Sequence, residues 1–158
     1  MNIRAATKED FPAILAIQGE NAKAAHWVQQ DYEKLAESGG GLLLVAEADA
    51  PASPKVIGFA ALDRVIDEAE LKNLAVATAH QHQGVGQALL REALARLRQA
   101  ATQRVYLEVR PSNIFAVQLY ASLGFVIHSR RKGYYSQPAE DAFVMALELS
   151  PQLAEKQP

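Results

Sequence analysis

The sequence predicts an α/β fold in which a central sheet is flanked by helices. Two observations support this prediction. The spacing of apolar residues changes several times between a period of two and a helical period, and a strand–helix–strand–helix segment occupies the middle of the chain. The predicted order of elements is β-α-α-β-β-β-α-β-α-β-β. We detect neither a repeat nor a second domain, so residues 1–149 are expected to form a single domain.

The first half of the chain is predicted to contain a strand, two helices and a hairpin. Thr7 can cap the first helix, with an acidic residue three positions later. The glycine run that begins at Gly39 ends the second helix. Two β-prone runs on either side of a turn-rich connector form the hairpin. These elements are a strand at 2–6, helices at about 11–18 and 29–37, and strands at 42–47 and 56–62.

The second half is predicted to alternate strands with helices. We expect Ser112 to cap the second of these helices and Gly124 to end it. The first strand loses its alternation toward its end, which predicts burial or local irregularity there. The elements are a strand at 70–76, a helix at 84–100, a strand at 104–110, a helix at 113–123, extended structure from 125 and a strand at 143–149. The tail at 150–158 is predicted to be disordered.

A right-handed crossover places the strands near 71–76 and 104–109 parallel to each other in the sheet. The intervening helix then covers one face. The carboxyl ends of the two strands open at the same edge of the sheet, which is where we expect a site.

Composition limits the function classes that remain. The chain has 158 residues, of which 49% are hydrophobic and 22% charged, so a sizeable core is possible. Its formal net charge of −2 predicts no general attraction to nucleic acid. The absence of cysteine excludes disulfides, thiolate nucleophiles and cysteine-based metal sites. A charged N-terminus and the lack of a long apolar run predict a cytoplasmic protein without a membrane segment.

A glycine-containing turn precedes the long helix and is a candidate anion site. Glycine allows close backbone approach, and the start of a helix exposes unpaired N–H groups, so the turn can receive a phosphate. A tight turn with no ligand explains the pattern equally well. Leu89 stands where a dinucleotide fingerprint needs glycine, and no Gly-Lys-Ser/Thr follows. The turn consists of Gln81, His82, Gln83, Gly84, Val85, Gly86 and Gln87.

Two histidines lie at or beside this turn, His80 and His82. No third side chain of a suitable type is near them in the sequence, so they are interpreted as solvated or capping residues. No metal site is predicted.

The turn motif Gln81-x-x-Gly84-x-Gly86 and the downstream run from Leu107 to Phe125 together resemble the GNAT superfamily of N-acetyltransferases. The order of elements agrees with that fold from Ile3 to about Leu149. Within the superfamily the chain is most similar to the RimI-type ribosomal-protein-alanine N-acetyltransferases. The segments that carry this similarity are 67–76, the Glu108-Val109-Arg110-x-Ser112-Asn113 run, Arg130-Arg131, Tyr134-Tyr135 and 140–147.

The resemblance implies a mixed, mostly antiparallel central sheet with a splayed parallel strand pair, and acetyl-CoA as the donor. The pyrophosphate would lie on the turn from Gln81 to Gln87. The pantetheine arm would run as an extra strand beside Leu74, Ala75 and Val76, and a backbone N–H near Leu74 or Val76 would polarise the thioester carbonyl. Asn113 would contact the pantetheine arm.

The same resemblance implies roles for Glu108 and Tyr120. Transfer of an acetyl group to an amine needs a base for the amine and a proton donor for the departing thiolate. Glu108 lies on the polar side of a strand, and burial there would make it a usable base, directly or through a water. Tyr120 would protonate the thiolate. Asn113 and Tyr120 are seven residues apart and thus share a helix face, about 10 Å apart along the axis. A salt-bridged Glu108 and a Tyr120 that only packs in the core are the alternatives.

The acceptor can be weighed by amine chemistry. A free α-amine ionises roughly two pH units below a lysine side chain, so a modest base suffices for it. This permits the family substrate, the N-terminal alanine of a small-subunit ribosomal protein, without selecting it over other N-termini. Trp27, Tyr134 and Tyr135 either flank the peptide entrance or only pack. The alternative functions are transfer to a small amine or lysine, and a non-catalytic acyl-CoA-binding module.

Overall fold

The computed structural model describes residues 1–149, and the predicted tail at 150–158 lies outside them. The elements follow the predicted order, with short 3₁₀ turns at Lys8–Asp10 and Thr78–His80. The helices are α1 (Phe11–Gly19), α2 (Gln29–Glu37), α3 (Val85–Gln99) and α4 (Ile114–Ser122). The strands are β1 (Asn2–Ala5), β2 (Gly41–Ala48), β3 (Lys55–Val65), β4 (Glu68–Val76), β5 (Arg104–Val109), β6 (Val126–Tyr135) and β7 (Glu140–Glu148).

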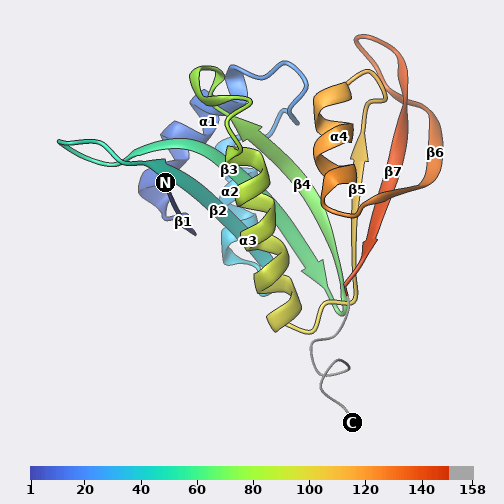
Figure 1. Ribbon diagram of the computed structural model, residues 1–158, viewed down its shortest axis with the longest axis horizontal. Helices are drawn as coiled ribbons and strands as arrows, with labels where there is room; N and C mark the ends of the chain where they lie inside the picture. Colours follow the sequence, from blue (N-terminus) through green and yellow to red (C-terminus); the bar gives the residue numbers. More distant parts are fainter. Residues whose placement is uncertain (150–158) are drawn as a thin grey trace.

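The seven strands form one sheet in the order β1-β2-β3-β4-β5-β7-β6. Every neighbouring pair is antiparallel except β4 and β5, which are parallel. Their pairing covers only Glu68–Glu70 with Arg104–Tyr106. Beyond these residues the two strands diverge toward their carboxyl ends, as Figure 1 shows. The predicted mixed sheet with a splayed parallel pair is confirmed.

Alternation along the strands creates a core on each face of the sheet. Leu44 and Leu62 pack with α3 on one face, together with Tyr120 of α4. Val45 and Phe59 pack with α1 and α2 on the other. Each large side chain that is fully buried in this way contributes about 2 kcal/mol of burial free energy. These two core layers therefore hold β2, β3 and β4 rigidly beside the gap that opens between the diverging ends of β4 and β5.

The start of α4 corrects one prediction. Its N-cap is Asn113, whose Oδ1 accepts a hydrogen bond from the Ala116 N–H at 3.4 Å, and not Ser112. Ser112 instead donates from its N–H and its hydroxyl to the Glu140 carboxylate, both at 2.8 Å. Because Glu140 on β7 binds Ser112, the serine does not cap α4. Gly124 ends α4 with a φ of +101°, as predicted.

Strand β4 is irregular in its middle, and not toward its end as the sequence predicted. Ala61 pairs with Asn73 and Leu62 pairs with Leu71, so Lys72 is an extra residue in the ladder. Such a bulge twists a strand locally and redirects its side chains. It lies next to the point where β4 leaves β5. In the part of the chain that the structure describes, no helix is both long and apolar enough to cross a membrane.

Candidate active site

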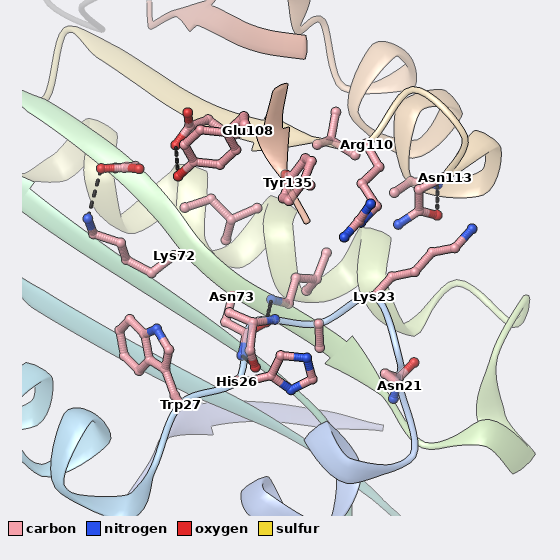
Figure 2. Close-up of a pocket in the computed structure, with 18 of the residues that line it drawn as sticks. Asn21, Lys23, His26, Trp27, Lys72, Asn73, Glu108, Arg110, Asn113 and Tyr135 are labelled. Carbon is pink, nitrogen blue, oxygen red and sulfur yellow. Dashed lines mark hydrogen bonds and ion pairs between the residues drawn. The ribbon is translucent and has the colours of Figure 1, made fainter. Parts of the chain in front are cut away.

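A cavity of about 750 Å³ lies at the gap between β4 and β5. Four of the predicted site residues line it: Leu74 from β4, Glu108 from β5, Asn113 at the start of α4 and Tyr120 within that helix. The loop between α1 and α2 and the turn after β6 close its sides. Figure 2 shows Glu108 and Tyr135 on one side of the cavity, with His26 and Trp27 across from them. The splayed strand ends thus form a site, as the sequence predicts.

The end of β4 presents the N–H groups of Leu74 and Val76 to the gap. The Ala77 N–H donates to Ile57 O at 2.8 Å, so by alternation the backbone of Ala75 faces β3 while Leu74 and Val76 face the gap. The Leu74 N–H lies 3.1 Å from Asn73 Oδ1. Among the described residues, no acceptor contacts the Val76 N–H. Of the two N–H groups considered from the sequence, that of Val76 is therefore the better placed to receive a ligand carbonyl.

The turn before α3 has the features of an anion site. His82 and Gly84 both have positive φ, 62° and 85°, which bends the chain into the helix. Within residues 1–149 none of the backbone N–H groups of residues 82–87 has a hydrogen-bond acceptor. Six N–H groups at one bend and helix start suit a pyrophosphate. The residues present therefore fit the phosphate end of coenzyme A.

The turn does not line the cavity itself, and its side chains have other contacts. Gln81 donates to Asn21 Oδ1 at 2.9 Å and to Val76 O at 3.2 Å, so its amide joins the turn to the end of β4. The His82 ring lies 4.5 Å from that of Phe115, at the start of α4. Ala75, Val76 and residues 81–87 are therefore adjacent to the cavity and outside its wall.

Glu108 has a charged environment. Its side chain is 17% exposed, and its Oε2 lies 2.6 Å from an Arg131 Nη1 atom. The Tyr134 hydroxyl donates to its Oε1 at 3.1 Å. The sequence-based expectation rested on burial, whereas the structure pairs this carboxylate with an arginine. Glu108 is therefore salt-bridged, which was the alternative considered from the sequence. Its carboxylate still lines the cavity.

Tyr120 is buried, and its hydroxyl has no hydrogen-bond partner among the described residues. Burial raises the pKa of its phenol, and the nearby Tyr135 adds to this. The Tyr120 ring also packs edge-on against Phe125 at 5.9 Å. Tyr120 is thus a core residue that presents a protonated hydroxyl to the cavity, and the two interpretations of it are compatible.

Asn73 is a site residue that the sequence analysis missed. It is buried in the β4 bulge, and its Nδ2 donates to the Tyr32 hydroxyl at 2.9 Å and to Gln18 Oε1 at 3.2 Å. Its Oδ1 accepts from the Ala25 N–H at 3.2 Å. These bonds fix the loop that carries Trp27 over the cavity. An asparagine between Leu71 and Ala75 at a core-facing position of the strand was the signal that could have identified it.

Aromatic side chains occupy both walls of the cavity. Trp27 packs on Tyr32 at 5.0 Å, and Tyr134 packs on Tyr135 at the same distance. Trp27, Tyr134 and Tyr135 line the cavity, whereas Tyr32 does not. These three side chains therefore both pack against other aromatic rings and flank the cavity entrance. Arg110 covers the Tyr135 ring at 4.3 Å and is held by Glu140. Within residues 1–149, no three His, Cys, Asp or Glu side chains form a metal-ligand group.

The sequence profile of the acetyltransferase (GNAT) family matches residues 3–125. The chain belongs to this family. Its members use acetyl-CoA, which agrees with the turn and the free strand edge described above. The resemblance noted from the motifs is thereby confirmed.

Curated relatives narrow the family further. The [ribosomal protein bS18]-alanine N-acetyltransferase of Haemophilus ducreyi is 35% identical over 93% of this chain and 99% of its own length. The Salmonella typhimurium enzyme of the same name is 41% identical over 89% and 93%. The match to the Escherichia coli enzyme, 43% identical, spans 61% of this chain and 66% of that protein, just under two thirds of its length.

Solved structures agree with this placement. The crystal structure of the Escherichia coli ribosomal-protein-S18-alanine N-acetyltransferase superposes with a TM-score of 0.80 at 33% identity, covering 94% of both chains. A ribosomal-protein-alanine N-acetyltransferase from Brucella melitensis gives 0.82 at 26% identity, covering 94% of this chain and 100% of that one. The GNAT fold of this chain therefore extends over nearly all of its described residues.

Proposed function

We propose that this protein transfers the acetyl group of acetyl-CoA to the N-terminal α-amine of a protein, and that its substrate is the N-terminal alanine of ribosomal protein bS18. The observation that carries the proposal is the cavity at the splayed strands, because it brings a carboxylate and a buried phenol to one open strand edge. The relatives bearing this activity in their names, which match nearly the full chain, support the substrate. A ribosomal protein would place the reaction in the cytoplasm.

The donor would be held at two points of the backbone. The free N–H groups of Gln83, Val85 and their neighbours in 82–87 would bind the pyrophosphate. The free N–H of Val76 would bind the thioester carbonyl and stabilise the charge that develops on its oxygen. The Asn113 side chain keeps its amide NH₂ available while its oxygen caps α4, so it can donate to the pantetheine arm.

Glu108 and Tyr120 would divide the proton transfers. Glu108 accepts a proton from the acceptor ammonium, which leaves a neutral amine. As the nitrogen–carbon bond forms and the carbon–sulfur bond breaks, Tyr120 donates its proton to the sulfur. The nitrogen loses its second proton to the Tyr120 oxygen, which restores the phenol, or to solvent, from which the Tyr120 oxygen then regains a proton. Glu108 releases its proton to solvent. Because burial raises the pKa of Tyr120, the proton it donates is present throughout the neutral range.

An acceptor panel tests this function. Peptides with the bS18 N-terminal sequence, N-acetylated peptides with a free lysine, and polyamines are offered with acetyl-CoA while CoA release is followed. We expect turnover on the free alanine N-terminus. A preference for the blocked lysine peptides or the polyamines would contradict the proposal.

The Glu108→Gln variant tests the base in the same assay. We expect kcat to fall about 100-fold or more, with acetyl-CoA binding retained. Glu148→Gln is the matched control, because Glu148 is also a strand glutamate paired with an arginine, Arg104, but is exposed outside the cavity. Unchanged turnover of Glu108→Gln would exclude Glu108 as the base.

A further inference from the structure

Glu108 and its ion-pair partner Arg131 differ in exposure. The Arg131 side chain, on β6, is 56% exposed, while that of Glu108 is only 17% exposed. The Tyr134 hydroxyl holds the other carboxylate oxygen. The carboxylate is therefore fixed, whereas the guanidinium lies at the surface and can leave without disturbing the core.

An acceptor ammonium would pair with the same carboxylate as Arg131, because Glu108 lines both the cavity and a neighbouring groove, whereas Arg131 lines only the groove. Two cations 4 Å apart repel each other by about 4 kcal/mol where the effective dielectric constant is near that of a protein surface. A substrate amine that approaches Glu108 from the cavity therefore competes with the guanidinium. Transfer cannot begin on Glu108 until this competition is resolved.

A second environment is available to the Arg131 guanidinium. Arg131 lines the neighbouring groove of about 490 Å³, which shares Glu70, Lys72 and Glu108 with the cavity. The groove also contains Asp63 and Asp67, whose carboxylates have no ion-pair or hydrogen-bond partner among the described residues. The guanidinium lies 4.5 Å from the Tyr134 ring, and the acidic lining of the groove provides a favourable electrostatic field for it when it leaves Glu108.

We propose that Arg131 is an exchangeable counter-ion of Glu108: the guanidinium pairs with the carboxylate until the α-ammonium of the acceptor takes its place, and it then withdraws from Glu108 within the acidic groove that it lines. Arg131 is thus a positioning residue that holds the carboxylate in place until a charged N-terminus replaces it. Tyr134 holds the carboxylate during the exchange. The inference rests on the proposed function, because it assigns Glu108 to the acceptor amine.

The test compares two peptides that differ only at the N-terminus. The bS18 N-terminal peptide is titrated with its free α-amine and with that amine acetylated, into CoA-saturated wild-type and Arg131→Gln enzyme, by calorimetry. We expect Arg131→Gln to bind the free peptide at least fivefold more tightly and the acetylated peptide with unchanged affinity. Arg131→Lys should restore the wild-type ratio.

Arg130→Gln is the matched control. Arg130 is the adjacent arginine on the same strand and is similarly exposed, but it pairs with Asp141 at 3.8 Å and not with Glu108. It should leave both affinities unchanged. Equal changes for the two peptides, the same effect in Arg130→Gln, or weaker binding of the free peptide to Arg131→Gln would overturn the exchange.

Binding and turnover keep this inference separate from the proposed function. The titration involves no acetyl transfer, so the exchange can fail while wild-type enzyme still acetylates the peptide. Conversely, a lack of turnover on every α-amine would refute the proposed function whatever the two affinities are. In steady state, the exchange predicts that Arg131→Gln lowers the acceptor KM more than it changes kcat.

Discussion

Glu108 and Tyr120 lie in different surroundings within the same cavity. Glu108 is bound by charged and polar side chains from β6, while Tyr120 is buried among apolar ones. The first environment suits a group that works as an anion, and the second suits a group that keeps its proton. The same cavity can therefore supply both a base and an acid.

Replacement of Tyr120 by phenylalanine tests the acid. The substitution removes only the hydroxyl, which has no hydrogen-bond partner among the described residues, so we expect the thermal midpoint to change by less than about 2 °C. We expect kcat to fall about 100-fold. CoA release in steady state and a thermal melt measure the two effects. An unchanged kcat would show that another group or solvent protonates the thiolate.

The sequence identifies these two side chains but not their partners. The motif around residues 107–125 predicts Glu108 and Tyr120 directly. Arg131 is 23 residues from Glu108, and Tyr134 is 26. Their contacts depend on the pairing of β7 with both β5 and β6, and β6 contains register shifts that alternation cannot predict. This is why the sequence could not decide between a buried Glu108 and a salt-bridged one.

At the scale of elements, acetyl-CoA binding should depend on the backbone conformation of the turn before α3. Gly84 has a φ of +85° with open space around its Cα, so Gly84→Ala introduces backbone strain without a clash. We expect a loss of about 1 kcal/mol in the free energy of unfolding. We also expect a severalfold weaker affinity for acetyl-CoA, because the strain shifts the N–H groups. Denaturant unfolding and calorimetry measure these effects, and an unchanged affinity would place the pyrophosphate elsewhere.

The junction of β1 with the following 3₁₀ turn should make the free energy of unfolding depend on pH. Arg4 binds both carboxylate oxygens of the buried Asp10, at 2.7 and 2.9 Å, and these bonds lower the pKa of Asp10. A lowered pKa gives stabilisation that is complete above the unfolded value of about 3.9 and is lost as the pH falls through the folded value.

Asp10→Asn should therefore cost about 2 kcal/mol at pH 7. The difference from wild type should shrink when the pH is lowered below about 4. Urea unfolding of both proteins at pH 7 and pH 3 measures this difference. A difference that stays constant across this range would mean that the charge of Asp10 does not contribute.

Element boundaries were largely predictable from sequence, because glycine, capping residues and apolar periods mark them. The cap of α4 was not. Ser112 and Asn113 are both good caps, and the choice depends on Glu140, which binds Ser112 from a distant strand. The exact place of the β4 bulge likewise depends on pairing with β3. Local signals thus determine what an element is, and long-range contacts determine how its ends are used.

At the scale of the whole molecule, bound acetyl-CoA should stabilise the fold. It would contact α3, α4 and β4 together. At 100 times its Kd a ligand adds about 2.7 kcal/mol, which corresponds to roughly 5–10 °C in the melting temperature of a domain of this size. A melt with and without acetyl-CoA measures this shift. Pantetheine, which lacks the pyrophosphate, should give a smaller shift. An equal shift would contradict the proposal that the turn binds the pyrophosphate.

Only three residue pairs join the parallel strands, so the sheet consists of two halves that share a narrow seam. Past Glu70 and Tyr106, the backbone amides that face the gap have no neighbouring strand to shield them. In the empty protein they should exchange their hydrogens with solvent quickly, and the two halves should flex against each other. A donor that fills the gap would act as a missing strand, which makes the reactant a temporary part of the architecture.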